Sequence, residues 1–210
     1  MRSEYQIYCD LDGVLVDFEA GVQRLFQKPS SSLSTKTLWI GIARSGNFFE
    51  TLPWTADGQE LWHALIHDFD GIPNILTGVP MNKSAREEKY NWCRRELEMP
   101  FREDGGDHEK VRISHVDMAG TKRQHACVNG MRRRGNVNVI TCWSKNKHIE
   151  SRRGAILIDD RLDLGTAWKE RGGTFVHHTS TETTLKELRD LGILKESSKN
   201  GATSKEKEDL

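Results

Sequence analysis

Short apolar runs bounded by turn residues recur along the 210-residue chain. Between several of these runs the apolar positions follow a helical period, most clearly over residues 83–97, 162–171 and 182–191. Strands that alternate with helices favour an α/β fold with a doubly wound, mostly parallel sheet. The runs that have the length of buried strands lie at residues 5–9 (YQIYC), 74–76 (NIL), 137–142 (VNVITC), 155–158 (AILI) and 174–178 (TFVHH).

Residues 17–70 interrupt this alternation, because they contain helical fragments but no strong strand run. We therefore predict a small helical cap inserted after the first strand, and an α/β core made of residues 1–16 and 71–194. A small helical unit needs aromatic residues for its own core, so any single ring is more often structural than functional. The large rings that gather in this segment are Trp39, Phe48, Phe49, Trp54 and Trp62.

Two other segments have weaker patterns. Residues 101–136 combine a loop-like start, a possible strand (VRISHV) and a helical stretch (TKRQHACVNGMRRRG) that Gly135 would end. Residues 195–210 have few apolar groups and no period, so we predict a disordered tail.

Positive and negative charges balance, with 31 Lys and Arg against 31 Asp and Glu. Residues 79–153 nevertheless hold 17 basic and 10 acidic side chains, a local excess of +7, so any attraction to nucleic acid would have to be local. No apolar run reaches the roughly 18 residues of a membrane span, and residues 1–10 have no apolar leader core, so we expect a cytoplasmic protein without a membrane partner. Four cysteines stand singly, without the spacing of a zinc site or a disulfide framework: Cys9, Cys93, Cys127 and Cys142.

Asp10 and Asp12, in the run DLDGVL after the first predicted strand, form the strongest local signal. Ligands of an open parallel sheet bind beyond the carboxyl ends of its strands, so both side chains are expected to project into the natural site. Asp10 can attack phosphorus as a nucleophile, while Asp12 protonates the leaving oxygen and later activates water. Alone, such a pair is a weak signal, since Asp and Gly also make turns.

Three further strand ends carry groups that suit the same chemistry. One offers a hydroxyl and an unhindered backbone N–H to phosphate oxygens, one offers a cation, and one offers hard oxygen ligands. These groups are Thr77 and Gly78 after the second strand, Lys145 or Lys147 after VNVITC, and Asp159 with Asp160 after AILI.

Oxygen atoms from distant parts of the chain are thus expected to meet around one divalent ion. Mg²⁺ prefers carboxylate, carbonyl and water oxygens, which Asp10, the main-chain carbonyl of Asp12 and Asp159 can supply. Asp160 is expected to act through water or from just behind the direct ligands. A metal ion and a lysine would neutralise the charge that phosphoryl transfer spreads over the equatorial oxygens.

The ordered set DLDGVL, ILTG, a lysine and LIDD resembles the four motifs of the haloacid dehalogenase superfamily of phosphotransferases, over residues 5–192. Asp12 argues against the dehalogenases themselves, which lack that second acid. The resemblance implies a Rossmann-like core and these roles: Asp10 as the nucleophile that becomes aspartyl-phosphate, Asp12 as general acid and base, Thr77 as the phosphate-binding hydroxyl, Lys147 in preference to Lys145 as the cation, and Asp159 with Asp160 as the metal carboxylates.

A narrower likeness is to the 5'(3')-deoxyribonucleotidases, carried by residues 48–54 (FFETLPW), 88–92 (EKYNW), 144–148 (SKNKH) and 156–163 (ILIDDRLD). Those enzymes also have a small helical cap between the first two motifs, and they remove phosphate from nucleoside monophosphates with cap aromatic rings against the base. Residues 99–135 are a longer and more basic connection than in that family. The resemblance implies that the nucleoside is faced by Phe48, Phe49, Trp39 and Trp54.

We therefore predict a Mg²⁺-dependent phosphomonoester hydrolase that acts on nucleoside or deoxynucleoside 5'-monophosphates. One alternative is a phosphatase for polynucleotide ends or for another small phosphate ester, with the basic excess over residues 79–153 favouring the polynucleotide. A second is a catalytically silent module that binds nucleotides. Steep salt dependence on oligonucleotides would favour the polynucleotide, and Mg²⁺-dependent phosphate release would exclude the silent module.

Overall fold

A computed structural model describes residues 4–98, 112–119 and 135–195 of the chain. The helix predicted after residue 120 lies outside these residues, as does the predicted tail beyond residue 195. Within the described residues, no helix combines the length and the apolar character that crossing a membrane requires.

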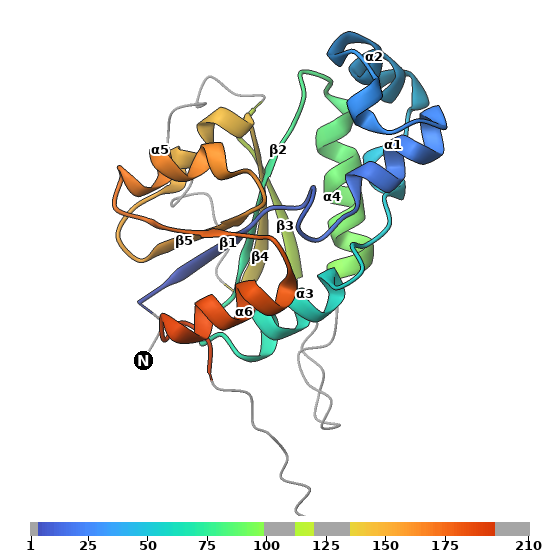
Figure 1. Cartoon of the computed structure of the whole chain (residues 1–210). Coiled ribbons are helices and arrows are strands. Elements are labelled where there is room, and N and C mark those ends of the chain that lie inside the picture. Colours follow the sequence, from blue (N-terminus) through green and yellow to red (C-terminus); the bar gives the residue numbers. More distant parts are fainter. Residues whose placement is uncertain (1–3, 99–111, 120–134, 196–210) are drawn as a thin grey trace, which may run out of the picture.

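In the part of the chain that the structure describes, six parallel strands form one sheet in the order β3-β4-β2-β1-β5-β6 (Figure 1). The α/β class and the parallel sheet predicted from the apolar runs are therefore confirmed. The possible strand in residues 101–136 is confirmed as well, as β3. The strands are β1 (Gln6–Cys9), β2 (Asn74–Gly78), β3 (Arg112–Asp117), β4 (Asn136–Cys142), β5 (Ala155–Asp159) and β6 (Thr174–His177).

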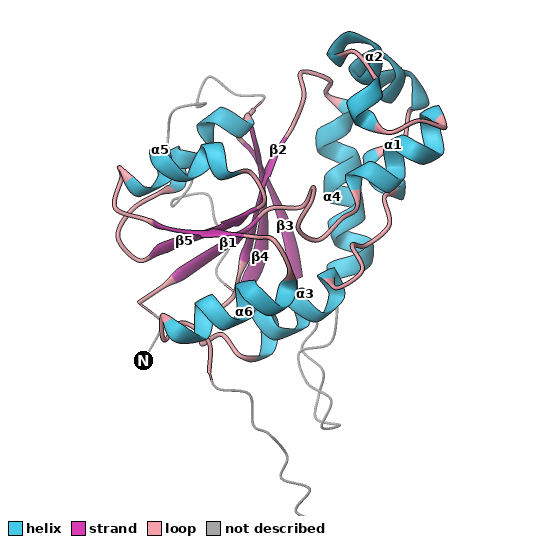
Figure 2. Ribbon diagram, viewed as in Figure 1, coloured by secondary structure: helices cyan, strands magenta, loops and turns pink. Residues whose placement is uncertain are grey.

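The described residues form six α-helices besides the sheet (Figure 2). Side chains that accept a backbone N–H begin three of them, with Asp17 before α1, Ser34 before α2 and Ser180 before α6. The helices are α1 (Phe18–Phe26), α2 (Thr35–Ser45), α3 (Gly58–His67), α4 (Ser84–Leu97), α5 (Gly165–Lys169) and α6 (Thr181–Asp190).

Successive residues of each strand point to opposite faces of the sheet, and each face has its own apolar cluster. On β1, Ile7 and Cys9 join the larger cluster, whereas Tyr8 joins the smaller one. Trp62 of α3 and Trp92 of α4 complete the larger cluster, and Trp168 of α5 packs edge-on against Tyr8 on the other face. Burial of both faces explains why the strands are continuous apolar runs.

The inserted segment, residues 17–70, holds α1, α2 and α3. Figure 1 shows α1 and α2 beside α4, away from the sheet, whereas α3 packs against α6. Val22 of α1 and Ile42 of α2 belong to the same apolar cluster as the sheet residues. The predicted helical content is thus present, and its role as a cap with a boundary at residue 70 stays a prediction.

The carboxyl ends of four neighbouring strands meet at one edge of the sheet. Cys9 of β1 pairs with Ile158 of β5, and Gly78 of β2 pairs with Cys142 of β4. The chain leaves these strands side by side, and the backbone N–H of Asp10 donates to the Ile158 carbonyl at 3.0 Å. The topology therefore brings the strand-end residues of the sequence motifs together.

Candidate active site

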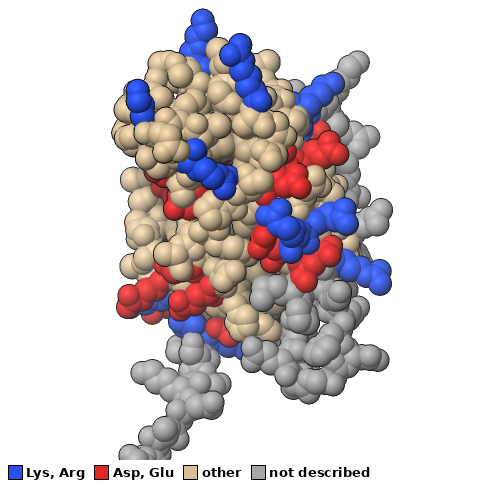
Figure 3. Space-filling model, turned by 90° about the vertical axis from the view of Figure 1, so that its right-hand side faces the viewer, with Lys and Arg blue, Asp and Glu red and all other residues tan. Residues whose placement is uncertain are grey.

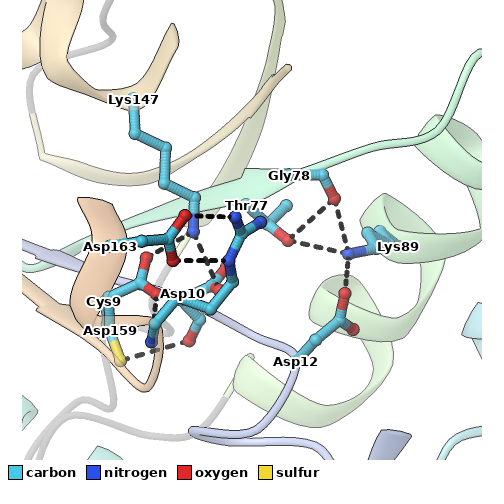
Figure 4. A network of polar contacts seen from close by, with 10 residues as sticks. Cys9, Asp10, Asp12, Thr77, Gly78, Lys89, Lys147, Asp159 and Asp163 are labelled. Atoms are coloured by element: carbon cyan, nitrogen blue, oxygen red, sulfur yellow. Dashed lines mark hydrogen bonds and ion pairs between the residues drawn. The ribbon is translucent and has the colours of Figure 1, made fainter. Parts of the chain in front are cut away.

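Lys147 connects two of the predicted acids. It lies in the 3₁₀ segment Ser144–Glu150 after β4, and its Nζ is 2.8 Å from Asp10 Oδ2 and 2.6 Å from Asp159 Oδ2 (Figure 4). Lys145 instead places its Nζ 5.7 Å from the ring centroid of Trp143. Of the two lysines that the sequence left open, Lys147 is the one at the acids.

Asp10, Asp159 and Asp160 form a cluster in which one ligand atom from each lies within 4.8 Å of the others. Asp10 and Asp159 are buried, and Asp160 is exposed. The buried Oδ1 of Asp10 has no hydrogen-bond partner among the described residues. Since buried polar atoms are normally satisfied, an orphaned carboxylate oxygen within an acidic cluster fits a hard cation such as Mg²⁺.

Burial and repulsion by the Asp10 carboxylate raise the pKa of Asp159 to about 6, although the positive charge of Lys147 acts in the opposite direction. Burial and the Asp10 charge also raise the pKa of Asp160. Burial opposes the charged form of Lys147, but the carboxylates of Asp10 and Asp159 outweigh it and raise the lysine pKa. The three carboxylates of this cluster face one ammonium group, that of Lys147, and their formal charge of −2 is one that a divalent cation would balance.

Asp12 is not a member of that cluster. Its Oδ2 accepts a hydrogen bond from Lys89 Nζ at 2.5 Å, and its Oδ1 is buried without a partner among the described residues. Burial raises the pKa of Asp12, and the nearby Lys89 charge opposes that rise. The predicted contact of Asp12 with the metal, through its main-chain carbonyl, stays a prediction, as does its role as general acid and base.

Lys89 is the site residue that sequence reasoning missed. The alternation of charges over residues 83–95 predicts a solvated helix face, yet Glu88 and Lys89 are buried on α4. That interpretation is wrong at these two positions because their partners come from other segments: Asp12 from the loop after β1 and Phe49 from the inserted segment. The helical period predicted α4 itself, but only the EKYNW likeness connected it with the site.

Thr77 is fully buried, and its hydroxyl accepts a hydrogen bond from Lys89 Nζ at 2.9 Å. Gly78 and Ser144, by contrast, line the open cavity beside the acids. A Cβ on Gly78 would collide with the Ser144 hydroxyl, so a larger residue there would displace the Ser144 side chain. The phosphate-binding role predicted for Thr77 and Gly78 stays a prediction.

Gly13 explains why glycine follows the two acids. Its φ of +77° is a backbone conformation that residues other than glycine rarely adopt. A Cβ at this position would also collide with the carboxylate of Asp160. The glycine therefore lets the loop after β1 approach the acid that follows β5.

A cavity of about 1370 Å³ opens beside the acids. Asp10, Asp160 and Lys147 lie in its wall, and Phe18, Trp39, Ile42 and Phe49 supply an apolar wall from the inserted segment. A cavity that combines carboxylates and a lysine with aromatic rings suits an ester with an organic leaving group.

Two of the four aromatic residues predicted to face a substrate, Phe49 and Trp39, line this cavity, and Phe48 and Trp54 are not among its described lining residues. Phe48 is buried with its ring centroid 5.1 Å from that of Phe49, so it supports the lining ring. Trp54 donates from Nε1 to Glu96 Oε2 at 2.9 Å and thereby fixes the inserted segment to α4.

Comparison with protein-family models and with curated proteins gives no match.

Proposed function

We propose that the protein is a Mg²⁺-dependent phosphomonoester hydrolase of the haloacid dehalogenase type, with nucleoside or deoxynucleoside 5'-monophosphates as substrates. The observation that carries this proposal is the meeting of Asp10, Lys147, Asp159 and Asp160 at one edge of the sheet, next to an open cavity. The order of these residues in the chain is that of the superfamily motifs they resemble.

The chemistry follows from the two acids after β1. A carboxylate oxygen of Asp10 forms a bond to phosphorus while the ester P–O bond breaks, and the proton of the Asp12 carboxyl passes to the leaving oxygen. Asp12, now a carboxylate, takes a proton from a water molecule that attacks the aspartyl-phosphate. That step releases inorganic phosphate and restores Asp10. The raised pKa of Asp12 favours the protonated form that the first step needs.

Asp10, Asp159 and Asp160 would hold the Mg²⁺ ion, which neutralises phosphate charge when bound. Lys147 remains between Asp10 and Asp159, so it supplies a fixed positive charge beside the nucleophile. The buried positions of Asp10 and Asp159 keep bulk water away from the reacting carboxylate.

The cavity supports an aromatic leaving group. Trp39 is 39% exposed although it lines the cavity, so part of its ring surface is available for stacking. The ring centroid of Phe18 lies 6.2 Å from that of Trp39, and Phe18 extends the aromatic wall. Stacking tolerates any base, so this wall favours a nucleoside without selecting one.

The test is phosphate release from a panel of nucleoside monophosphates and sugar phosphates, with and without Mg²⁺. We expect Mg²⁺-dependent release by the wild type and a loss of at least about 1,000-fold in turnover for Asp10→Asn, with its thermal unfolding close to that of the wild type. Release at the parental rate by Asp10→Asn, or release without any divalent ion, would contradict the proposal.

A phosphorylated polynucleotide end is the second candidate, and one observation favours it. Residues 20–49, which include most of α1 and all of α2, carry four basic side chains and no acidic one. Figure 3 views the molecule from the right-hand side of Figure 1, and at the top, where α1 and α2 lie, it shows Lys and Arg without Asp or Glu. A steep fall in activity with salt on a phosphorylated oligonucleotide, and not on a mononucleotide, would favour this candidate.

A further inference from the structure

Lys89 occupies a place that suits neither the metal nor the phosphate. Its side chain is 2% exposed, and Nζ donates to Asp12 Oδ2 at 2.5 Å, Thr77 Oγ1 at 2.9 Å and the Gly78 carbonyl at 2.8 Å (Figure 4). An ammonium group has three N–H donors, and these acceptors use all three. Lys147, which lies between the two acids, is thus the lysine suited to a phosphate.

The contacts of Lys89 hold the Asp12 carboxyl at one oxygen. Asp12 Oδ2 is anchored to Lys89, while Oδ1 has no partner among the described residues and the residue lines the cavity. A buried ammonium group is costly unless it is paired, so the pair is held firmly. This contact therefore fixes the orientation of the Asp12 carboxyl at the wall of the cavity.

The same turn of α4 also holds the aromatic wall. Glu88, the residue before Lys89, accepts the backbone N–H of Phe49 at 3.0 Å, and Lys89 Nζ lies 4.8 Å from the Phe49 ring centroid. Two consecutive residues thus fix the acid after β1 and a ring of the cavity wall relative to each other. A substrate seated against Phe49 would meet Asp12 in a constant position.

We propose that Lys89 is a positioning residue for Asp12, which it holds where its carboxyl can protonate the leaving oxygen as the ester P–O bond breaks. The proposal rests on the proposed phosphatase function. It predicts that Lys89 acts through Asp12 and not through the nucleophile. The loss of activity on replacing Lys89 should therefore be larger for an ester whose leaving group needs a proton.

The experiment compares two esters in four proteins: wild type, Lys89→Met, Asp12→Asn and the double variant. A nucleoside 5'-monophosphate leaves as an alkoxide and needs a general acid, whereas 4-nitrophenyl phosphate leaves without one. General acid catalysis contributes about 10²- to 10⁴-fold, so we expect Lys89→Met to reduce kcat/KM on the nucleotide by at least about tenfold more than on the aryl ester. The ratio kcat/KM is compared because it reports the step in which the ester bond breaks, whereas kcat also includes the hydrolysis of the aspartyl-phosphate that both esters share. Adding Lys89→Met to Asp12→Asn should cause no further loss.

Arg86→Met is the matched control, because Arg86 also lies on α4 and pairs with an acid of the sheet, Asp117, at 3.2 Å. Arg86→Met should change the activity on the two esters by the same factor. If Lys89→Met does not fold, Lys89→Gln keeps most of the packing and one donor group, and it replaces Lys89→Met in the cycle.

Equal losses on the two esters, or a further multiplied loss in the double variant, would overturn the role of Lys89 while leaving the proposed function intact. A wild type that releases phosphate from neither ester would overturn the proposed function, and the role of Lys89 with it.

Discussion

His178 shows how burial sets protonation at a single residue outside the acidic cluster. Its side chain is 7% exposed, and Nδ1 pairs with Thr184 Oγ1 of α6 at 2.9 Å. Burial lowers the pKa of His178, the Asp57 charge opposes this, and His177 adds to it. The folded protein therefore holds this ring neutral at a pH where the unfolded chain would protonate it.

The sign of the resulting pH dependence follows from linkage. The unfolded pKa of histidine is about 6.5 and the folded pKa is lower, so the stabilisation is fully present above about pH 6.5 and is lost as the pH falls. We expect the free energy of unfolding of the wild type to fall between about pH 7.5 and about pH 5, and to fall less in His178→Gln. Urea unfolding at both pH values measures this.

His63→Gln serves as the comparison, because His63 is exposed on α3. It should keep the pH dependence of the wild type. An unchanged slope in His178→Gln would show that another group causes the loss.

Single residues of the site were predictable where they end a strand and not where they lie inside a helix. Asp10, Asp159 and Asp160 follow apolar runs, and parallel strands bring such positions together. Lys147 was favoured over Lys145 by resemblance alone, since its 2% exposure depends on acids from two other strands. Lys89 could not be found from charge alternation, because its three acceptors lie 11 to 77 positions away in the chain.

At the scale of elements, the loop after β1 depends on glycine for two separate reasons. Gly13 has a positive φ, and it also approaches the carboxylate of Asp160 too closely for any Cβ. Gly46 ends α2 with a similar φ of +80°, but no atom lies within 4 Å of the place its Cβ would take. A comparison of substitutions at Gly13 and Gly46 therefore distinguishes the effect of backbone strain from the effect of displacing Asp160.

We expect Gly13→Ala and Gly46→Ala each to lower the free energy of unfolding by about 1–2 kcal/mol, because both force a left-handed residue. Only Gly13→Ala should also weaken Mg²⁺ binding, which titration calorimetry measures directly, because Asp160 must move. Equal Mg²⁺ affinity in the two variants would remove Asp160 from the proposed metal site.

Strands were predicted more reliably than helices, for a physical reason. Both faces of the sheet are buried, so β1, β2, β4, β5 and β6 appear as continuous apolar runs of the observed position. The helix predicted over residues 162–171 is instead a 3₁₀ turn followed by the short α5. Gly165 lies against the Phe175 ring, a tertiary contact that a local pattern does not contain.

At the scale of the whole molecule, the cavity lies between the acid edge of the sheet and the inserted helices. Its aromatic and aliphatic lining comes largely from α1, α2 and the segment around Phe49, whereas Asp10, Lys147 and Asp160 come from the strand ends. In the proposed function, the first set would contact the leaving group and the second would perform the reaction. A substitution in the wall should therefore change KM for large substrates without changing the chemistry.

Trp39→Ala tests that separation. Stacking of a base on a ring contributes about 1–3 kcal/mol, so KM for a nucleoside monophosphate should rise about tenfold, while a phosphate ester without a ring should keep its KM. Leu25→Ala is the control, because Leu25 is 38% exposed, close to the 39% of Trp39, and is not among the described lining residues. If Trp39→Ala raises KM for both esters alike, the aromatic wall does not recognise the leaving group.

The central claim is that Asp10 takes up the phosphoryl group. The direct measurement uses a nucleoside 5'-monophosphate whose phosphoryl group is labelled. The wild type is quenched rapidly with acid during turnover of this substrate in the presence of Mg²⁺, and the labelled peptide is then mapped. We expect the label on the peptide that contains Asp10, and none in Asp10→Asn. Label on a different residue, or turnover without label on the protein at any quench time, would contradict the account.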